Sequence, residues 1–184
     1  IVLKGKGPGN WNWVAGYDAK ADKWLDVNLA YRFNAQTFVT VGQYKQPNSM
    51  EELSSTKNND FISKAMTTNL FAVARRMGAK VDYLQTNWGA TASIYDREMT
   101  RNLAQGAGYG LRGYFAPINQ PNQFLHLGLS YNDFDAEDTN QQPSARLRVR
   151  PDADLATARL VDTGNFADAD SIATTGLEAA YLNG

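Results

Sequence analysis

The amino-acid sequence predicts an all-β chain, an antiparallel transmembrane β-barrel, and three observations support this prediction. Apolar and polar residues alternate with a period of two over several segments. The 184 residues include 4 Trp, 9 Tyr and 8 Phe, whereas only 20% are charged, a balance that suits a protein with one face in lipid and the other in water. The longest apolar runs are far shorter than the ~18–20 residues that a membrane-spanning helix requires. The mean hydropathy of −0.46 fits a barrel, because every second side chain then faces a polar interior.

The alternation identifies the individual strands. It is clearest in 24–33, where the apolar odd-numbered side chains share one face and Asp26 and Arg32 lie on the other. Segment 124–134 repeats it, with leucines on one face and His126 on the other, and in 109–115 Arg112 lies opposite Tyr109 and Leu111. Many of these segments approach the ~9–11 residues of a tilted strand that crosses a bilayer. In all we expect about eight strands, at 11–18, 24–33, 37–44, 77–85, 88–96, 109–115, 124–134 and 174–182.

The connections differ in length as they do in outer-membrane barrels, where short turns lie at one end and long loops at the other. We expect one partial barrel domain over 1–184. The alternative is a soluble β-sandwich, whose strands also alternate with one buried face. Its strands are usually shorter, with a mode of ~5–6 residues, and here aromatic residues lie at strand ends, as in an interfacial girdle. The expected short connections are 19–23, 34–36, 86–87 and 117–123, and the long ones are 45–76, 97–107 and 135–172.

The first long loop, about 45–76, carries two possible helix starts, at 47–49 and at 58–60. A loop with helical turns of its own is expected to pack, and in a barrel the place to pack is the lumen. It would then bring hydroxyls and one cation there at four consecutive positions, Ser54, Ser55, Thr56 and Lys57. The alternative is an exposed polar loop whose polar residues cap helices.

The second long loop, about 135–172, contains three arginines at alternate positions, Arg146, Arg148 and Arg150. In an extended segment they share one side at a spacing of ~6.5–7 Å. The guanidinium fork suits phosphate and carboxylate oxygens, and a row of weak sites gives a route for selective conduction. The alternative is an edge strand whose arginines limit aggregation or pair with Asp152 and Asp154.

The sequence does not predict an enzyme, a metal site or a cofactor. His126 is the single histidine and cysteine is absent, which leaves little support for a metal cluster or a His-based triad. Glu51 and Glu52 are adjacent and so point to different faces of any helix or strand. The net charge of −1 gives no indication of a nucleic-acid partner.

The stretch GLRGYFAPINQPNQFLHLGLSYNDFDAED, residues 110–138, resembles the central hairpin of the phosphate-selective porins, the O/P type of Gram-negative outer membranes. NWNWVAGYD (10–18) and GQYKQPNSMEELSSTKNNDFISKA (42–65) resemble a preceding strand and the inward-folded constriction loop of that family. The resemblance implies a 16-stranded barrel in the bacterial outer membrane, usually a homotrimer, that passively conducts inorganic phosphate or other small anions. The implied anion-binding residues are Arg146, Arg148, Arg150, Ser55, Thr56, Lys57 and Lys64, and those at the constriction are Asp26 and Glu52. The strand alternation adds Arg112 and His126 to the lumen, where we expect His126 to be structural.

Two departures weaken a strictly phosphate-selective interpretation. Glu52 stands where phosphate-selective members place a lysine, and Asp152 and Asp154 follow the arginines in place of a further basic residue. A general porin with weak ion selectivity therefore stays open, as does, less strongly, a soluble carbohydrate-binding β-sandwich. Because eight strands are half of sixteen, and an eight-stranded barrel is filled by side chains, we expect this chain to be a fragment of a larger porin.

Overall fold

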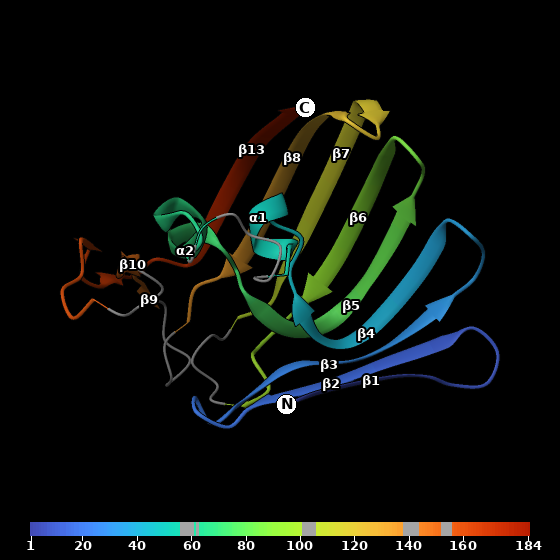
Figure 1. Ribbon diagram of the computed structural model, residues 1–184. Helices are drawn as coiled ribbons and strands as arrows, with labels where there is room; N and C mark the ends of the chain where they lie inside the picture. Colours follow the sequence, from blue (N-terminus) through green and yellow to red (C-terminus); the bar gives the residue numbers. More distant parts are fainter. Residues whose placement is uncertain (56–60, 62, 101–105, 138–143, 152–155) are drawn as a thin grey trace.

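One antiparallel sheet of nine strands dominates the computed structural model of the chain (Figure 1). The structure describes residues 1–55, 61, 63–100, 106–137, 144–151 and 156–184. Each strand pairs with the next along the chain, so β1 and β13 form the two edges of the sheet. The strands are β1 (Val2–Lys6), β2 (Trp11–Asp18), β3 (Lys23–Arg32), β4 (Thr37–Lys45), β5 (Arg75–Leu84), β6 (Trp88–Tyr95), β7 (Gly108–Gln120), β8 (Gln123–Asp135) and β13 (Ser171–Asn183).

The sheet curves like part of a barrel wall, and two short helices lie on its concave side, α1 (Met50–Leu53) and α2 (Met66–Phe71) (Figure 1). Four two-residue strands belong to the connection between β8 and β13. They form two small sheets, β10 (Arg148–Val149) with β11 (Val161–Asp162), and β9 (Ser144–Ala145) with β12 (Phe166–Ala167). β10 lies against α2, so the two long loops meet beside the sheet.

The eight expected strands are all present, but some bounds differ, and β1 and the four two-residue strands β9 to β12 were not expected. β1 was not expected, because Gly5, Gly7 and Gly9 around Pro8 look like a loop in the sequence. The connection expected at 117–123 was wrong: β7 runs on to Gln120, with a register shift between Phe115 and Ile118. That shift accommodates Pro117, which lacks an N–H and is tolerated in a sheet at such a bulge. β13 begins at Ser171, three residues before the expected 174.

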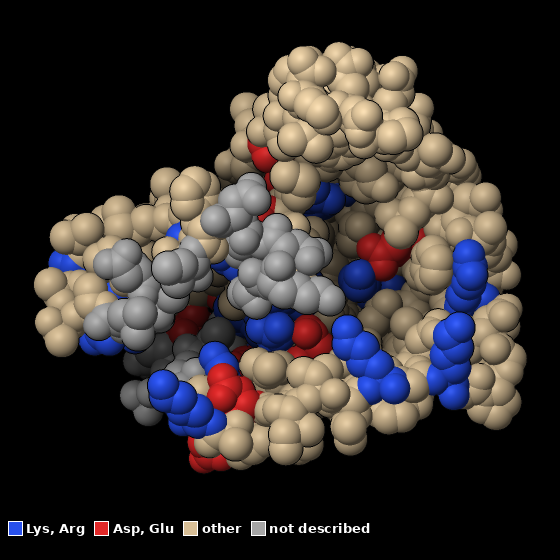
Figure 2. Space-filling model, in the orientation of Figure 1, with Lys and Arg blue, Asp and Glu red and all other residues tan. Residues whose placement is uncertain are grey.

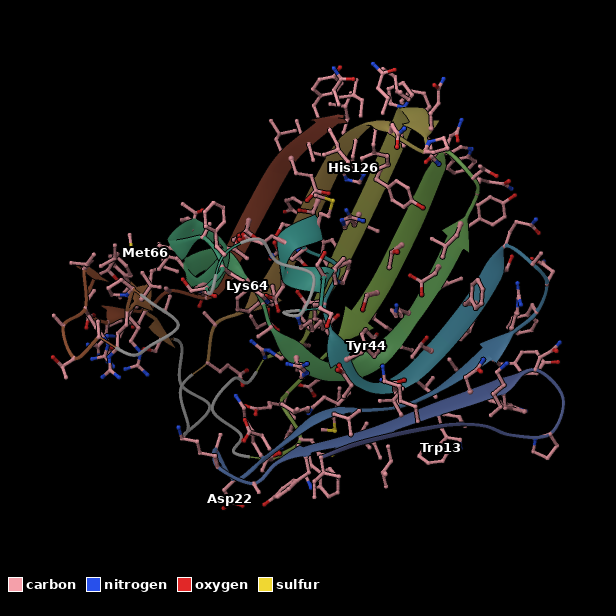
Figure 3. The ribbon with its side chains drawn as sticks, viewed as in Figure 1. Trp13, Asp22, Tyr44, Lys64, Met66 and His126 are labelled. Atoms are coloured by element: carbon pink, nitrogen blue, oxygen red, sulfur yellow. The ribbon has the colours of Figure 1, made fainter. Side chains whose placement is uncertain are left out.

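The two faces of the sheet have opposite polarity, as the period of two predicts. One row of register partners, on the convex face, is apolar and exposed, with Ile94 at 67% exposure. The neighbouring row of register partners, on the concave face, is mostly polar and less exposed, and the exposure of Asn132 is 1%. In Figure 3, Tyr44 and His126 point to the concave side and Trp13 points away from it. The convex row is Trp13, Leu29, Val41, Ala79, Ile94 and Tyr109, beyond which it continues with Asp133 on β8 and Ala173 on β13. The concave row is Thr40, Lys80, Ser93, Gly110, Asn132 and Thr174.

This polarity contradicts the β-sandwich alternative, in which the apolar face of a sheet is the buried one. The connections also alternate between the two ends of the sheet. The turns at 7–10, 33–36, 85–87 and 121–122 share one end, and the long connections 46–74, 96–107 and 136–170 share the other, where only 19–22 is short (Figure 1). None of the helices in the described ranges has the length and apolar character needed to cross a membrane.

Candidate pore-lining site

The described part of the first long loop lies on the concave face and is bonded to the wall by its backbone. The Asn132 side chain on β8 donates to the carbonyl oxygen of Pro47 at 2.8 Å. The Met50 N–H, at the start of α1, donates to the carboxylate of Glu178 on β13. Gln46 is buried, and its side-chain oxygen accepts from the Ser93 hydroxyl at 2.7 Å. Three strands of the wall therefore fix the start of this loop.

Local sequence explains the path of the loop. Ser49 caps α1, because its side-chain oxygen accepts the backbone N–H of Glu52 at 3.2 Å. Pro47 approaches the wall at Gly110, where an added Cβ would lie 2.9 Å from the Pro47 Cγ. Glycine is thus required at this position for the close approach. The helix start expected at 58–60 lies outside the described residues, and α2 begins at Met66 without a side-chain cap.

Glu52, Lys45 and Lys64 form a buried ion cluster on this loop, which we call the Glu52–lysine cluster. Lys64 pairs directly with the Glu52 carboxylate, and the Lys45 Nζ lies 3.7 Å from its other oxygen. Both ammonium groups also donate to the Glu52 backbone carbonyl oxygen. Two of the residues implied by the resemblance, Lys64 and Glu52, are therefore partners of each other.

Other cations of the inner wall are paired as well. Asp26 accepts two hydrogen bonds from the Arg75 guanidinium, at 3.2 and 3.0 Å. Lys80 Nζ lies 2.7 Å from Asp82. Figure 2 shows blue and red residues gathered together in the hollow of the sheet. This stretch of the wall thus carries charges of both signs in close contact.

Arg112, His126 and Glu178 meet on neighbouring strands. The Glu178 carboxylate pairs with the Arg112 guanidinium and lies 2.9 Å from His126 Nε2. The His126 ring stacks on Tyr114, at a centroid distance of 5.4 Å. Sequence reasoning placed Arg112 and His126 here but missed Glu178. The alternation within 171–183 was the signal that could have found it, because Glu178 is the single charged residue of that strand.

The three arginines of the second long loop differ from one another. Arg146 forms two hydrogen bonds with Asp162, at 2.8 and 2.7 Å. The bond from Arg146, with one from the Gly164 N–H, lowers the pKa of Asp162 to about 2. Within the described ranges, Arg148 is exposed on β10 and Arg150 is half-buried, and neither forms an ion pair with a carboxylate. The Nε of Arg150 also lacks a hydrogen-bond partner there.

The remaining expected residues are placed only in part. Ser55 is exposed just after α1. Thr56, Lys57, Asp152 and Asp154 lie outside the described residues. No group of acidic and His residues that could hold a metal ion occurs in the part of the chain that the structure describes.

A cavity of about 420 Å³ lies between the first loop and the edge strand β13. Its lining is rich in hydroxyl groups, which can donate to and accept from a hydrated solute. The hydroxyl-bearing residues are Ser49, Thr67, Thr68, Ser130, Thr174 and Thr175.

A curved antiparallel sheet with an apolar exposed outer face, a polar inner face and a loop bonded onto that inner face defines the wall of a membrane β-barrel channel. The comparison with protein families agrees with this class. The family model described as phosphate-selective porin O and P matches residues 1–184, and the chain belongs to this family. The members of this family are described as porins, which are channels and not enzymes.

An uncharacterized protein of Caulobacter vibrioides is 28% identical over 175 residues. The alignment covers 89% of this chain and 35% of that relative, so the chain spans about a third of the relative's length.

Proposed function

We propose that the protein is part of a passive channel of the bacterial outer membrane for small anions, with phosphate or polyphosphate as the favoured solutes. Membership of the phosphate-selective porin family supports this proposal. The observation that carries the anion preference is the pair Arg148 and Arg150, which form no ion pair with a described carboxylate. Guanidinium groups without a fixed counterion are free to bind a permeating anion.

The proposed partners follow from the same family. Lipid would contact the apolar convex face, and a homotrimer is the assembly that the resemblance implies. Small anions would pass along the concave face, between the first loop and the arginines beside α2.

The test is ion selectivity in planar lipid bilayers, measured on the full-length protein as a reversal potential across a KCl gradient, with and without added phosphate. Arg148→Ala with Arg150→Ala is expected to lower the anion preference and to weaken block by phosphate. Arg146→Ala is the matched control, because Arg146 is already paired with Asp162 and its loss is expected to change selectivity less. Unchanged selectivity in the double variant would refute the role of these arginines.

A general porin with weak ion selectivity is the second candidate, and the paired charges of the inner wall favour it. Asp26, Asp82, Glu52 and Glu178 each hold a cation of this wall. Paired charges produce a weaker field than isolated ones, since their potentials largely cancel. A reversal potential near zero and no block by phosphate would support the general porin over the anion channel.

A further inference from the structure

We propose that Glu52 sets the ion preference of the channel by binding Lys45 and Lys64 and so withholding their charges from the lumen. This inference rests on the proposed function as an ion-conducting channel. It makes Glu52 a residue that determines specificity through its two lysine partners.

The burial of the Glu52–lysine cluster supports this role. The side chains are 8% exposed for Glu52, 13% for Lys64 and 17% for Lys45. Lys64 donates to the Glu52 carboxylate and to the Glu52 backbone carbonyl oxygen, whereas Lys45 donates to the same carbonyl oxygen and its Nζ lies 3.7 Å from the carboxylate. The two ammonium groups therefore direct donors toward Glu52 inside the loop, and little of either side chain is exposed to a passing ion.

Contacts other than those of the two lysines also hold the backbone around Glu52. Ser49 fixes the backbone of α1 through the Glu52 N–H at 3.2 Å. Asn132 and Glu178 hold the preceding residues Pro47 and Met50 against the wall. Lys45, in turn, is the last residue of β4 and is held by the sheet. The cluster thus forms on a backbone that other contacts keep in place.

Removal of the carboxylate charge should therefore release the lysines without moving the loop. An ammonium group left buried without its counterion is strongly unfavourable. The flexible four-carbon stem of lysine allows the charged end to extend into water while the stem stays packed. On this face of the sheet, the water into which the ammonium would extend is that of the lumen. The lumen would then contain two mobile ammonium groups whose charge is no longer partly neutralised by the Glu52 carboxylate.

Glu51 supplies a matched control within the same helix. Its carboxylate accepts from the Ala65 N–H at 2.8 Å and from the Thr68 hydroxyl, and it forms no ion pair with a described cation. Glu51→Gln and Glu52→Gln remove the same charge from adjacent positions. A difference between them measures the release of the lysines and not the change in net charge.

The experiment measures the reversal potential of the full-length protein in planar bilayers at low salt. Glu52→Gln is expected to raise the anion-to-cation permeability ratio about fivefold over Glu51→Gln, the factor for one unit charge within a few ångströms of an ion in water. With Lys45→Met and Lys64→Met both present, the two glutamine variants are expected to give equal shifts. The proposal would be overturned if the two glutamine variants changed the permeability ratio equally while the lysines are present. It would also be overturned if Glu52→Gln kept its larger effect after both lysines were replaced.

A second measurement needs no variant. Lys45 and Lys64 of the wild-type channel should react with a small amine-directed acylating reagent much more slowly than Lys20, which is exposed in the 19–22 turn. Reaction at the rate of Lys20, read by mass spectrometry, would overturn the proposal. A cation-selective wild-type channel would instead contradict the proposed function as an anion channel. The difference between Glu51→Gln and Glu52→Gln tests only the role of Glu52, so the two failures can be told apart.

Discussion

At the scale of single residues, the alternating arginines show what a local pattern can and cannot predict. The period of two predicts that the three guanidiniums share one side; in the structure Arg146 and Arg148 are exposed, Val149 is buried and Arg150 is half-buried. The pattern does not reveal that Asp162, sixteen residues after Arg146, binds its guanidinium. That contact depends on the return of the chain through β11, which no local alternation encodes.

The Arg146–Asp162 pair leads to a prediction about pH. The pKa of Asp162 is lowered to about 2, so the paired form persists down to that pH and Arg146 stays occupied between pH 5 and 8. Arg146→Ala should raise the pKa of Asp162 toward the ordinary 3.8. The measurement is a carboxyl NMR titration of Asp162. As a control, Arg159→Ala should raise the pKa of Asp162 less, because the Arg159 Nη1 lies 3.8 Å from the Asp162 carboxylate. An unchanged pKa of Asp162 in Arg146→Ala would contradict the Arg146–Asp162 pair.

At the scale of elements, the sequence predicts strands better than it predicts the contacts of the loops. A strand with two different faces alternates in polarity at every second residue, and this is why the sequence identifies all eight expected strands. The residues that hold the first loop are single positions on distant strands, Asn132, Glu178 and Gly110. Ser49 was found as part of a helix start because its cap is local, whereas the Glu178 contact spans 128 positions.

The close approach at Gly110 leads to a prediction about the loop. Gly110→Ala would place a Cβ 2.4 Å from the Asn132 side-chain oxygen and 2.9 Å from the Pro47 Cγ, which should displace the loop at a cost of roughly 1–3 kcal/mol. Single-channel recordings should show higher conductance or added current noise.

The control for this prediction lies on the same strand. At Gly113 an added Cβ would have one neighbour within 4 Å, the Gly89 carbonyl oxygen at 3.9 Å. Gly113→Ala should therefore leave the recordings unchanged. Equal recordings from the Gly110 and Gly113 variants would contradict the close packing of the loop on β7.

At the scale of the whole molecule, the alternation in the sequence predicts the polarity of the sheet only in part. Alternation alone identifies two faces but not which of them is buried, so a sandwich and a barrel are equally compatible with it. The structure distinguishes them, because polar residues such as Gln43, Ser93 and Asn132 are buried while large apolar ones are exposed. The expected count was one too low for the large sheet, since glycine and proline around β1 hide its pattern.

This polarity predicts how the folded protein responds to a charge on its convex face. Leu129 lies at the middle of β8, is 54% exposed and pairs with Gly113 and Leu177 on the adjacent strands. If that face contacts lipid, Leu129→Arg should lower the free energy of unfolding from bilayer vesicles by roughly 2–4 kcal/mol, the cost of arginine near the midplane. The same change on a water-exposed face would cost little, because surface substitutions usually change the free energy of unfolding by less than about 0.5 kcal/mol.

Asn122→Arg, in the turn between β7 and β8, is the control and should leave the free energy of unfolding nearly unchanged. Denaturant titrations of the full-length protein in vesicles measure both values, and a neutral Leu129→Arg would show that the convex face meets water and not lipid.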